Sequence, residues 1–147
     1  MNRASLCSIP IEDIRAEHFD PALRERGSQL FETVLQQSQD CVKLISPDGR
    51  LDFMSVNGLC AMEIDDFAIA EGSFWWELWP SEAQDMVRSA VERACAGQRA
   101  EFEAFCPTAK GNPRWWQVRV SPIHDGDGQV SALLSVSRDI SHRFPAA

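Results

Sequence analysis

The side chains that could carry catalytic or metal chemistry are scattered along this 147-residue chain. Ser121, His124 and Asp125 supply the residue types of a hydrolase triad, but no strand-turn-helix nucleophile elbow surrounds the serine. The segment that begins at Asp125 resembles a calcium loop, yet its twelfth position is Val136 rather than the glutamate that an EF-hand needs. Residues 108–111 lack the preceding glycines of a phosphate-binding loop. We therefore interpret these segments as turns and predict no catalytic residue.

The cysteines give no stronger signal. Their number is odd, and no C-x-x-C pair indicates a zinc site or a redox motif. No stretch approaches the roughly 20 apolar residues needed to cross a bilayer, and residues 1–14 hold no run of signal-peptide length. We therefore expect a cytoplasmic protein without a metal site or membrane contact, in which the cysteines are small buried residues. They are Cys7, Cys41, Cys60, Cys95 and Cys106.

Charge excludes one class of partner. The 22 acidic and 14 basic residues give a net charge of −8, and the arginines are scattered singly. Nucleic-acid binding needs a clustered basic face, so we expect no nucleic-acid partner. With 44% hydrophobic and 24% charged residues, the composition is that of one globular domain.

The elements that must position any site begin with a helix. After a leader over residues 1–27, with Asp20 and Pro21 as a candidate helix start, residues 28–40 show helical periodicity. This flanking helix either packs on its own domain or pairs with a second copy, and periodicity does not distinguish the two. Its apolar stripe consists of Leu30, Phe31, Val34 and Leu35.

The remaining pattern predicts two strands, a helical middle and three more strands. The fold class is therefore α+β: a five-stranded antiparallel sheet with a helical layer on one face and a pocket between them. The expected strands cover residues 41–46, 51–55, 100–106, 114–122 and 129–137, with short helical turns over 57–70 and a helix that opens at 79–82 and ends at Gly97.

Several short matches, in the same order along the chain, resemble a bacterial PAS domain over about residues 28–142. Residues 105–111 with Trp115 and Trp116 look like the PAS modules of sensor histidine kinases. The resemblance implies a sensory or protein-interaction module, often dimeric, in cytoplasmic signal transduction, with a core over residues 41–141 and a tail over 142–147. The other matches are Gln39-Asp40-Cys41-Val42-Lys43, Ser46-Pro47-Asp48-Gly49-Arg50-Leu51, Asn57-Gly58, residues 79–97, Arg114-Trp115-Trp116-Gln117-Val118, Ser121-Pro122-Ile123, Asp127-Gly128 and Ser137-Arg138-Asp139-Ile140-Ser141.

The resemblance leaves the cofactor unknown. Blue-light relatives carry a reactive cysteine beside a flavin, but Trp75 stands at that position here. Haem-binding relatives use a histidine of the central helix, and residues 81–96 contain none. Cys95 could serve as an axial ligand but is better explained as a small residue near a helix end. We therefore expect neither a flavin photoadduct nor a His-ligated haem.

The last segment that resembles a PAS domain indicates signal output through Arg138, Asp139 and Ile140. Asp139 could pair with Arg138 or another arginine, or cap the residues that follow, and Asp139→Ala is predicted to preserve folding but uncouple signalling. The sequence His142-Arg143-Phe144-Pro145 is not a phosphoacceptor pattern, so any kinase activity belongs to another domain or chain. The expected partner is a second copy or a signalling protein such as a histidine kinase.

Strand alternation places Trp115 and Trp116 on opposite faces of the sheet. We predict that Trp116, with Val118 and Val120, faces the cavity, whereas Trp115 lies on the outer face under the flanking helix or a second subunit. The candidate lining of a small-molecule cavity is Phe53, Asn57, Met62, Trp76, Met86, Phe102, Trp116, Val118 and Leu134.

The leading hypothesis is a sensory or interaction module without catalytic activity. One alternative is a structural dimerisation domain with a filled core. Another is a small cone-fold enzyme of the ketosteroid-isomerase kind, which would use Asp52 or Glu103 as a pocket carboxylate. Both residues alternate away from apolar neighbours, so we expect them to point outward.

Overall fold

The computed structural model describes residues 25–145, so the leader with Asp20 and Pro21 lies outside the described residues. The chain divides into two compact units, residues 1–37 and 38–147. Helix α2 (Gly27–Gln37) belongs to the first unit and has no buried residue. It ends three residues before the predicted end at Asp40. There, the Ser38 hydroxyl accepts a hydrogen bond from the Asp40 amide at 3.2 Å, a local contact that competes with helix formation.

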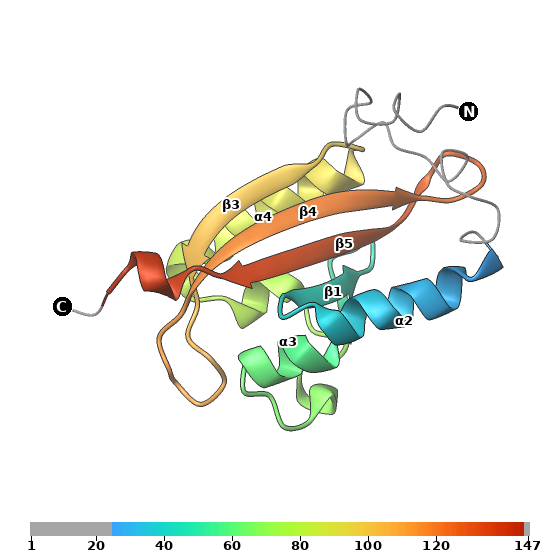
Figure 1. The fold of residues 1–147 in the computed structure, drawn as a ribbon. Helices are drawn as coiled ribbons and strands as arrows, with labels where there is room; N and C mark the ends of the chain where they lie inside the picture. The colour runs from blue at the N-terminus through green and yellow to red at the C-terminus, as the bar shows by residue number, and fades with distance from the viewer. Residues whose placement is uncertain (1–24, 146–147) are drawn as a thin grey trace. The chain divides into compact units, whose positions relative to one another are not determined.

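The second unit is built on the predicted five-stranded antiparallel sheet (Figure 1). The strands follow the spatial order β2-β1-β5-β4-β3, so the last strand is central and pairs with both β1 and β4. The strands are β1 (Cys41–Ile45), β2 (Leu51–Met54), β3 (Ala100–Phe105), β4 (Trp115–His124) and β5 (Val130–Asp139).

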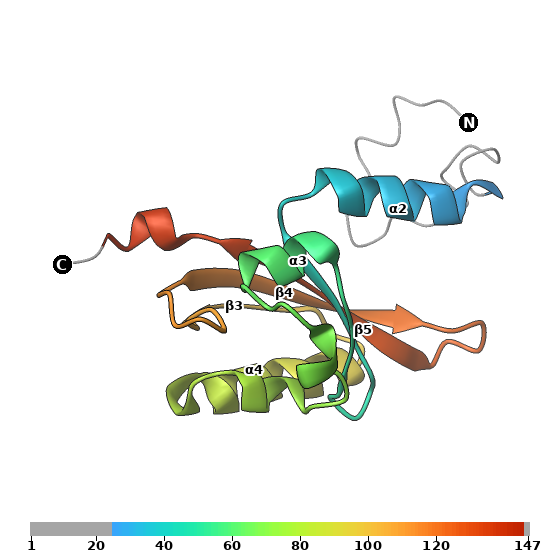
Figure 2. The ribbon, with the colours of Figure 1, turned by 90° about the horizontal axis from the view of Figure 1, so that it is seen from below.

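Four helical segments separate the first hairpin from β3, and Figure 2 shows α4 on one side of the sheet. α3 begins where the Ser55 hydroxyl accepts hydrogen bonds from Gly58 N at 3.2 Å and from Val42 N at 3.1 Å. These bonds tie the helix start to β1. The segments are α3 (Val56–Ala61), η4 (Phe67–Ile69), η5 (Trp75–Leu78) and α4 (Ser81–Cys95); a further turn, η6 (Ser141–Arg143), follows β5.

The inner face of the sheet differs from the prediction at β5. Leu133 is buried, whereas Leu134, predicted to line the cavity, lies on the opposite face. Register explains this correction, because Ser135 pairs with Val120 and Ser137 with Val118, and paired residues share a face of the sheet. Ser135 and Ser137 therefore face the helical layer, although the opposite alternation of β5, with Leu134 and Val136, is more apolar.

Candidate functional site

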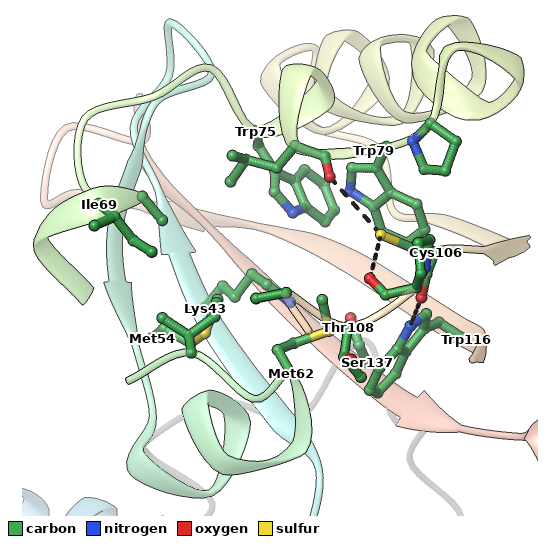
Figure 3. Close-up of a pocket in the computed structure, with 16 residues that line it drawn as sticks. Lys43, Met54, Met62, Ile69, Trp75, Trp79, Cys106, Thr108, Trp116 and Ser137 are labelled. Atoms are coloured by element: carbon green, nitrogen blue, oxygen red, sulfur yellow. Dashed lines mark hydrogen bonds between the residues drawn. The ribbon is translucent and has the colours of Figure 1, made fainter. Parts of the chain in front are cut away.

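The second unit contains a cavity of about 430 Å³ between the inner face of the sheet and the helical segments (Figure 3). Twelve of its sixteen lining residues are apolar, and four carry polar groups. The polar four are Lys43, Cys106, Thr108 and Ser137; the apolar twelve are Met54, Met62, Ile64, Ile69, Ala70, Trp75, Leu78, Trp79, Pro80, Pro107, Ala109 and Trp116.

The charged group of the pocket is Lys43, on the inner face of β1. Lys43 is 6% exposed, and its Nζ donates a hydrogen bond to Cys41 Sγ at 3.0 Å. The same nitrogen lies 6.0 Å from the centroid of the Trp75 ring. Sequence reasoning missed this lysine, because Val42 and Leu44 made the opposite face of the strand look equally apolar. Pairing of Lys43 with Ser135 on β5 and with Met54 on β2 places it inward.

Cys106 lies where β3 leads into the loop before β4, and it is buried. Burial raises the pKa of its thiol to about 11, against the opposing effect of the Lys43 charge. The thiol is therefore protonated at neutral pH, and it donates to the Leu78 carbonyl at 3.7 Å. The Cys106 carbonyl in turn accepts a hydrogen bond from the indole of Trp116 at 3.0 Å, which orients that ring at the pocket wall.

One side of the pocket is closed by contacts between residues 62–64 and the loop 107–113. Thr108 Oγ1 donates to the Glu63 carboxylate at 2.6 Å, and Asn112 Nδ2 donates to the same oxygen. The Ala109 amide donates to the Met62 carbonyl at 2.9 Å. The bonds from Thr108 and Asn112 lower the pKa of Glu63, so this junction holds a carboxylate.

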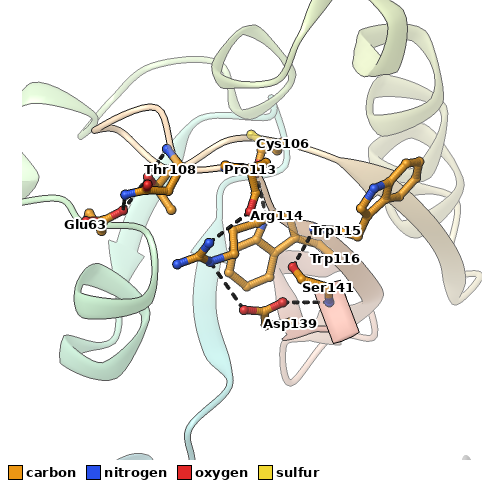
Figure 4. A network of polar contacts seen from close by, with 10 residues as sticks. Glu63, Cys106, Thr108, Pro113, Arg114, Trp115, Trp116, Asp139 and Ser141 are labelled. Carbon is orange, nitrogen blue, oxygen red and sulfur yellow. Dashed lines mark hydrogen bonds and ion pairs between the residues drawn. The ribbon is translucent and has the colours of Figure 1, made fainter. Parts of the chain in front are cut away.

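Of the predicted output residues, Arg138 and Asp139 end β5 and Ile140 follows it, and Figure 4 shows the contacts of Asp139. Asp139 forms an ion pair with Arg114 at 3.5 Å and accepts a hydrogen bond from Ser141 N at 2.8 Å. Both of the roles considered for Asp139 are therefore present, with Arg114 rather than Arg138 as the partner. Arg138 instead pairs with Asp40 at 3.3 Å, and Ile140 is fully buried.

A sequence profile of the PAS fold matches residues 35–143, which is about three quarters of the chain. The chain belongs to the PAS-fold family. This confirms the resemblance found in the sequence and explains the sheet order and the helical layer over one face. PAS domains are in general sensory and interaction modules. No curated protein sequence matches the chain.

Solved PAS domains share the fold at low sequence identity. A PAS domain from Colwellia psychrerythraea is 17% identical, covers 79% of this chain and 98% of its own, and gives a TM-score of 0.69. The PAS domain of an HTR-like protein from Haloarcula marismortui is 18% identical, with 81% and 96% coverage and a TM-score of 0.64. A domain of a putative light and redox sensing histidine kinase from the same organism is 12% identical, with 76% and 98% coverage and a TM-score of 0.59.

The pocket of this PAS domain takes in only two of the nine predicted lining residues, Met62 and Trp116. Trp75 is buried and lines the pocket in place of the predicted Trp76. The neighbouring Trp76 does not line the pocket. Its ring stacks on Phe74 with the ring centroids 4.9 Å apart, and Arg88 Cζ lies 5.1 Å from its ring centroid.

The other predicted lining residues lie elsewhere for identifiable reasons. Met86 is 40% exposed on the outer side of α4, whose buried face consists of alanines and valines. Phe102 packs in the core against Trp79 at 5.6 Å, and Val118 is fully buried in the same core. The amide of Asn57 donates to the Ser38 carbonyl. Phe53 and Leu134 are half-buried and do not line the pocket.

The remaining candidates for chemistry are not assembled at this pocket. Asp52 and Glu103 are exposed and do not line it. The Asp125 carboxylate accepts hydrogen bonds from the Asp127 and Gln129 amides at 2.9 and 3.0 Å, as expected of a turn. Within residues 25–145, no group of three potential metal ligands occurs, and no helix has the length and apolarity to cross a membrane.

Of the four cysteines that the structure describes, two are buried as expected, and Cys60 is exposed. All four are free thiols, while Cys7 lies outside the described residues. Cys95 is partly exposed, and its thiol donates to the Pro47 carbonyl at 3.1 Å.

Proposed function

We propose that this PAS domain is a sensory module of bacterial signal transduction that binds a small molecule in the pocket between its sheet and its helical layer. The observation that carries the proposal is the cavity of about 430 Å³, because ligand sites typically enclose about 300 to 1,000 Å³ behind mostly apolar walls. A structural dimerisation domain with a filled core, the alternative considered above, would leave no such space. The free state of the four described cysteines supports a reducing compartment, the cytoplasm.

Two strands join the pocket to the proposed output. Ser137 lines the pocket and lies two residues before Asp139 on β5. Trp116 lines the pocket on β4 and pairs directly with Asp139 across the sheet. A ligand that displaces Trp116 or Ser137 therefore acts within one cross-strand pair of the Asp139–Ser141 hydrogen bond. This adjacency supports transmission of ligand binding to the segment that follows β5.

The proposal is tested by ligand binding to the purified chain. Native mass spectrometry detects a retained molecule, and tryptophan fluorescence reports added compounds because Trp75, Trp79 and Trp116 line the pocket. Ile69 lines the pocket yet is 71% exposed, so Ile69→Trp is expected to obstruct its mouth and weaken binding. Val56→Trp is the control, because Val56 is 74% exposed outside the pocket. Absence of any bound molecule in a broad small-molecule screen would contradict the proposal and favour a structural role.

Self-association through α2 is the second part of the proposal. Leu30, Phe31 and Val34 are large apolar side chains about half exposed on this helix, and Leu35 is partly buried. We expect the chain to be a dimer by light scattering after size exclusion, and Val34→Asp to make it monomeric, whereas Val56→Asp leaves the dimer intact. A monomeric wild-type protein would contradict self-association and favour docking to another signalling protein, such as a histidine kinase.

A further inference from the structure

The polar part of the pocket is organised around a buried cation. Lys43 is the charged residue among the sixteen that line the pocket, and 94% of its surface is covered. Figure 3 shows its side chain projecting from β1 toward the interior of the pocket. An ammonium group removed from water is costly unless an anion or several acceptors replace the lost hydration.

The protein itself does not supply that anion. Within residues 25–145, no carboxylate lies within 4.0 Å of Lys43 Nζ, whose hydrogen-bond partner is the sulfur of Cys41. The thiol that lines the pocket, Cys106, has its pKa raised to about 11 and carries no charge at neutral pH. The Glu63 carboxylate is already held by Thr108 and Asn112 and is not part of the pocket lining. The ammonium is therefore left without a counter-charge.

Two hydroxyl groups beside Lys43 are also left without partners. Ser135 Oγ and Ser137 Oγ are buried and form no hydrogen bond in the described structure. Ser135 pairs with Lys43 across the sheet, and Ser137 pairs with Cys41, so both serines lie on the strand next to the lysine. Ser137 also lines the pocket. Buried polar groups are nearly always satisfied, so a hydroxyl without a partner next to an ammonium without a counter-charge indicates a missing acceptor.

The remaining walls limit how polar that acceptor molecule can be. The apolar residues include three tryptophans and two methionines, and Thr108 Oγ1 already donates to Glu63. A phosphate group would bring more charge and more oxygens than one ammonium and one hydroxyl can satisfy. A single carboxylate on an apolar body matches both the donors and the walls.

We propose that the pocket recognises a small organic monocarboxylate, with the carboxylate bound by Lys43 and Ser137 and the apolar body against Trp75, Trp79 and Trp116. This inference rests on the proposed function, because it names the ligand class of the same pocket. Hydrogen bonds to charged groups are the strongest available here, so the carboxylate supplies most of the specificity.

The test compares probes that share an apolar body and differ in one head group. The probes are octanoate, 1-octanol and octylamine, together with 3-phenylpropionate, its alcohol and its amine, titrated by calorimetry and tryptophan fluorescence at neutral pH. In at least one series, the acid is expected to bind at least about tenfold more tightly than the alcohol, and the amine not at all. For the wild-type chain, calorimetry and tryptophan fluorescence are expected to give the same preference for the acid.

Matched variants assign the preference to the lysine. Lys43→Met keeps the apolar stem and removes the charge; it is expected to abolish the preference for the acid while the alcohol still binds. Lys110→Met removes the other lysine of the chain, which is exposed and pairs with Asp65 at 3.6 Å, and is expected to change nothing. Ser137→Ala is expected to weaken acid binding about threefold to tenfold and gives a second assay if Lys43→Met does not fold.

The outcomes separate this inference from the proposed function. Equal binding of acid and alcohol by the wild type, tighter binding of the amine, or an unchanged acid preference in Lys43→Met overturns the carboxylate inference and leaves a ligand pocket. Binding of none of the probes by the wild type overturns the carboxylate inference, and the broad screen described above then decides the proposed function independently.

Discussion

The rings of Trp115 and Phe144 stack with their centroids 4.2 Å apart and 16° between their planes. Trp115 begins β4 directly before the pocket residue Trp116, whereas Phe144 lies after β5 in the segment that follows η6. The Trp115 amide also donates to Ser141 Oγ at 2.9 Å, and its carbonyl accepts from Ile140 N at 2.9 Å. The outer face of Trp115 is thus covered by the chain's own C-terminal segment.

Phe144→Ala is expected to loosen that segment without unfolding the domain. An aromatic pair of this kind contributes about 1 kcal/mol, so Tm should fall by about 3 °C. Amide hydrogen exchange of residues 141–144 should accelerate, while exchange in β4 stays unchanged. Ile123→Ala, which truncates a similarly exposed apolar side chain on β4, is the control and should leave residues 141–144 protected. Unchanged exchange at 141–144 in Phe144→Ala would show that the stack does not hold the segment.

Asp139 combines an ion pair with a cap, and two substitutions separate them. Asp139→Ala removes both the Arg114 ion pair and the acceptor for Ser141 N, whereas Asp139→Asn keeps an acceptor oxygen. Because the ion pair is partly exposed, it contributes at most about 1 kcal/mol. We expect Asp139→Ala to stay folded, with faster exchange at residues 141–144, and Asp139→Asn to resemble the wild type. Equally accelerated exchange at residues 141–144 in both variants would assign the effect to the loss of the ion pair alone.

Glu63 makes the junction between residues 62–64 and loop 107–113 sensitive to acid. Hydrogen bonds from Thr108 and Asn112 lower its pKa below the ordinary value of 4.5. A carboxyl group with a lowered folded-state pKa stabilises the fold above its unfolded pKa, and this contribution is lost as the pH falls through the folded pKa. The Tm difference between wild type and Glu63→Gln should therefore be largest above about pH 5 and shrink below pH 4. A Tm difference that does not change with pH would contradict a lowered pKa at Glu63.

Cys106 is expected to resist alkylation, although it lines the pocket. A thiol of pKa about 11 holds far less thiolate at pH 8 than an ordinary thiol of pKa near 8.5. Iodoacetamide should therefore modify Cys106 on the order of 100-fold more slowly than an ordinary exposed thiol. Peptide mass spectrometry of a time course provides the measurement, with exposed Cys60 as the internal reference. Comparable rates at the two cysteines would contradict the burial of Cys106.

Gly49 permits close contact between the first hairpin and Trp76. Its φ is +95°, and a Cβ built there would lie 2.2 Å from an atom of the Trp76 ring. Gly49→Ala should therefore destabilise the domain by about 2 to 3 kcal/mol, from backbone strain together with displacement of the ring. Gly126→Ala, where no atom lies within 4 Å, should change stability by less than about 0.5 kcal/mol. Equal denaturation midpoints for the two variants would refute this.

The strand pattern and the order of elements followed from local signals. Pro47-Asp48-Gly49-Arg50 predicted the first hairpin, and the turn around Asp125 and Gly128 predicted the last one. Alternation along residues 114–122 placed Trp116, Val118 and Val120 on the buried face, as found. Turn chemistry and strand periodicity are properties of a few neighbouring residues, so one sequence was sufficient to predict the α+β fold.

The pocket depended on contacts between distant segments, and its prediction was therefore less accurate. Trp75 and Trp76 are adjacent and chemically identical. Only the orientation of η5 in the folded domain decides that Trp75, rather than Trp76, enters the pocket. Met86 fitted the apolar periodicity of α4, but the buried stripe is narrow enough to leave it outside. Packing between elements, rather than the residues themselves, made these choices.

By itself, the sequence determined the PAS fold and the apolar character of the inner face. Only the tertiary structure decided that Lys43, Ser135 and Ser137 share that face, because both faces of β1 carry apolar residues and the alternation of β5 favoured its serine face outward. The register of β5 against β4, and of the sequence-distant β1 against β5, turned the lysine inward. That register gives the apolar pocket its positive charge.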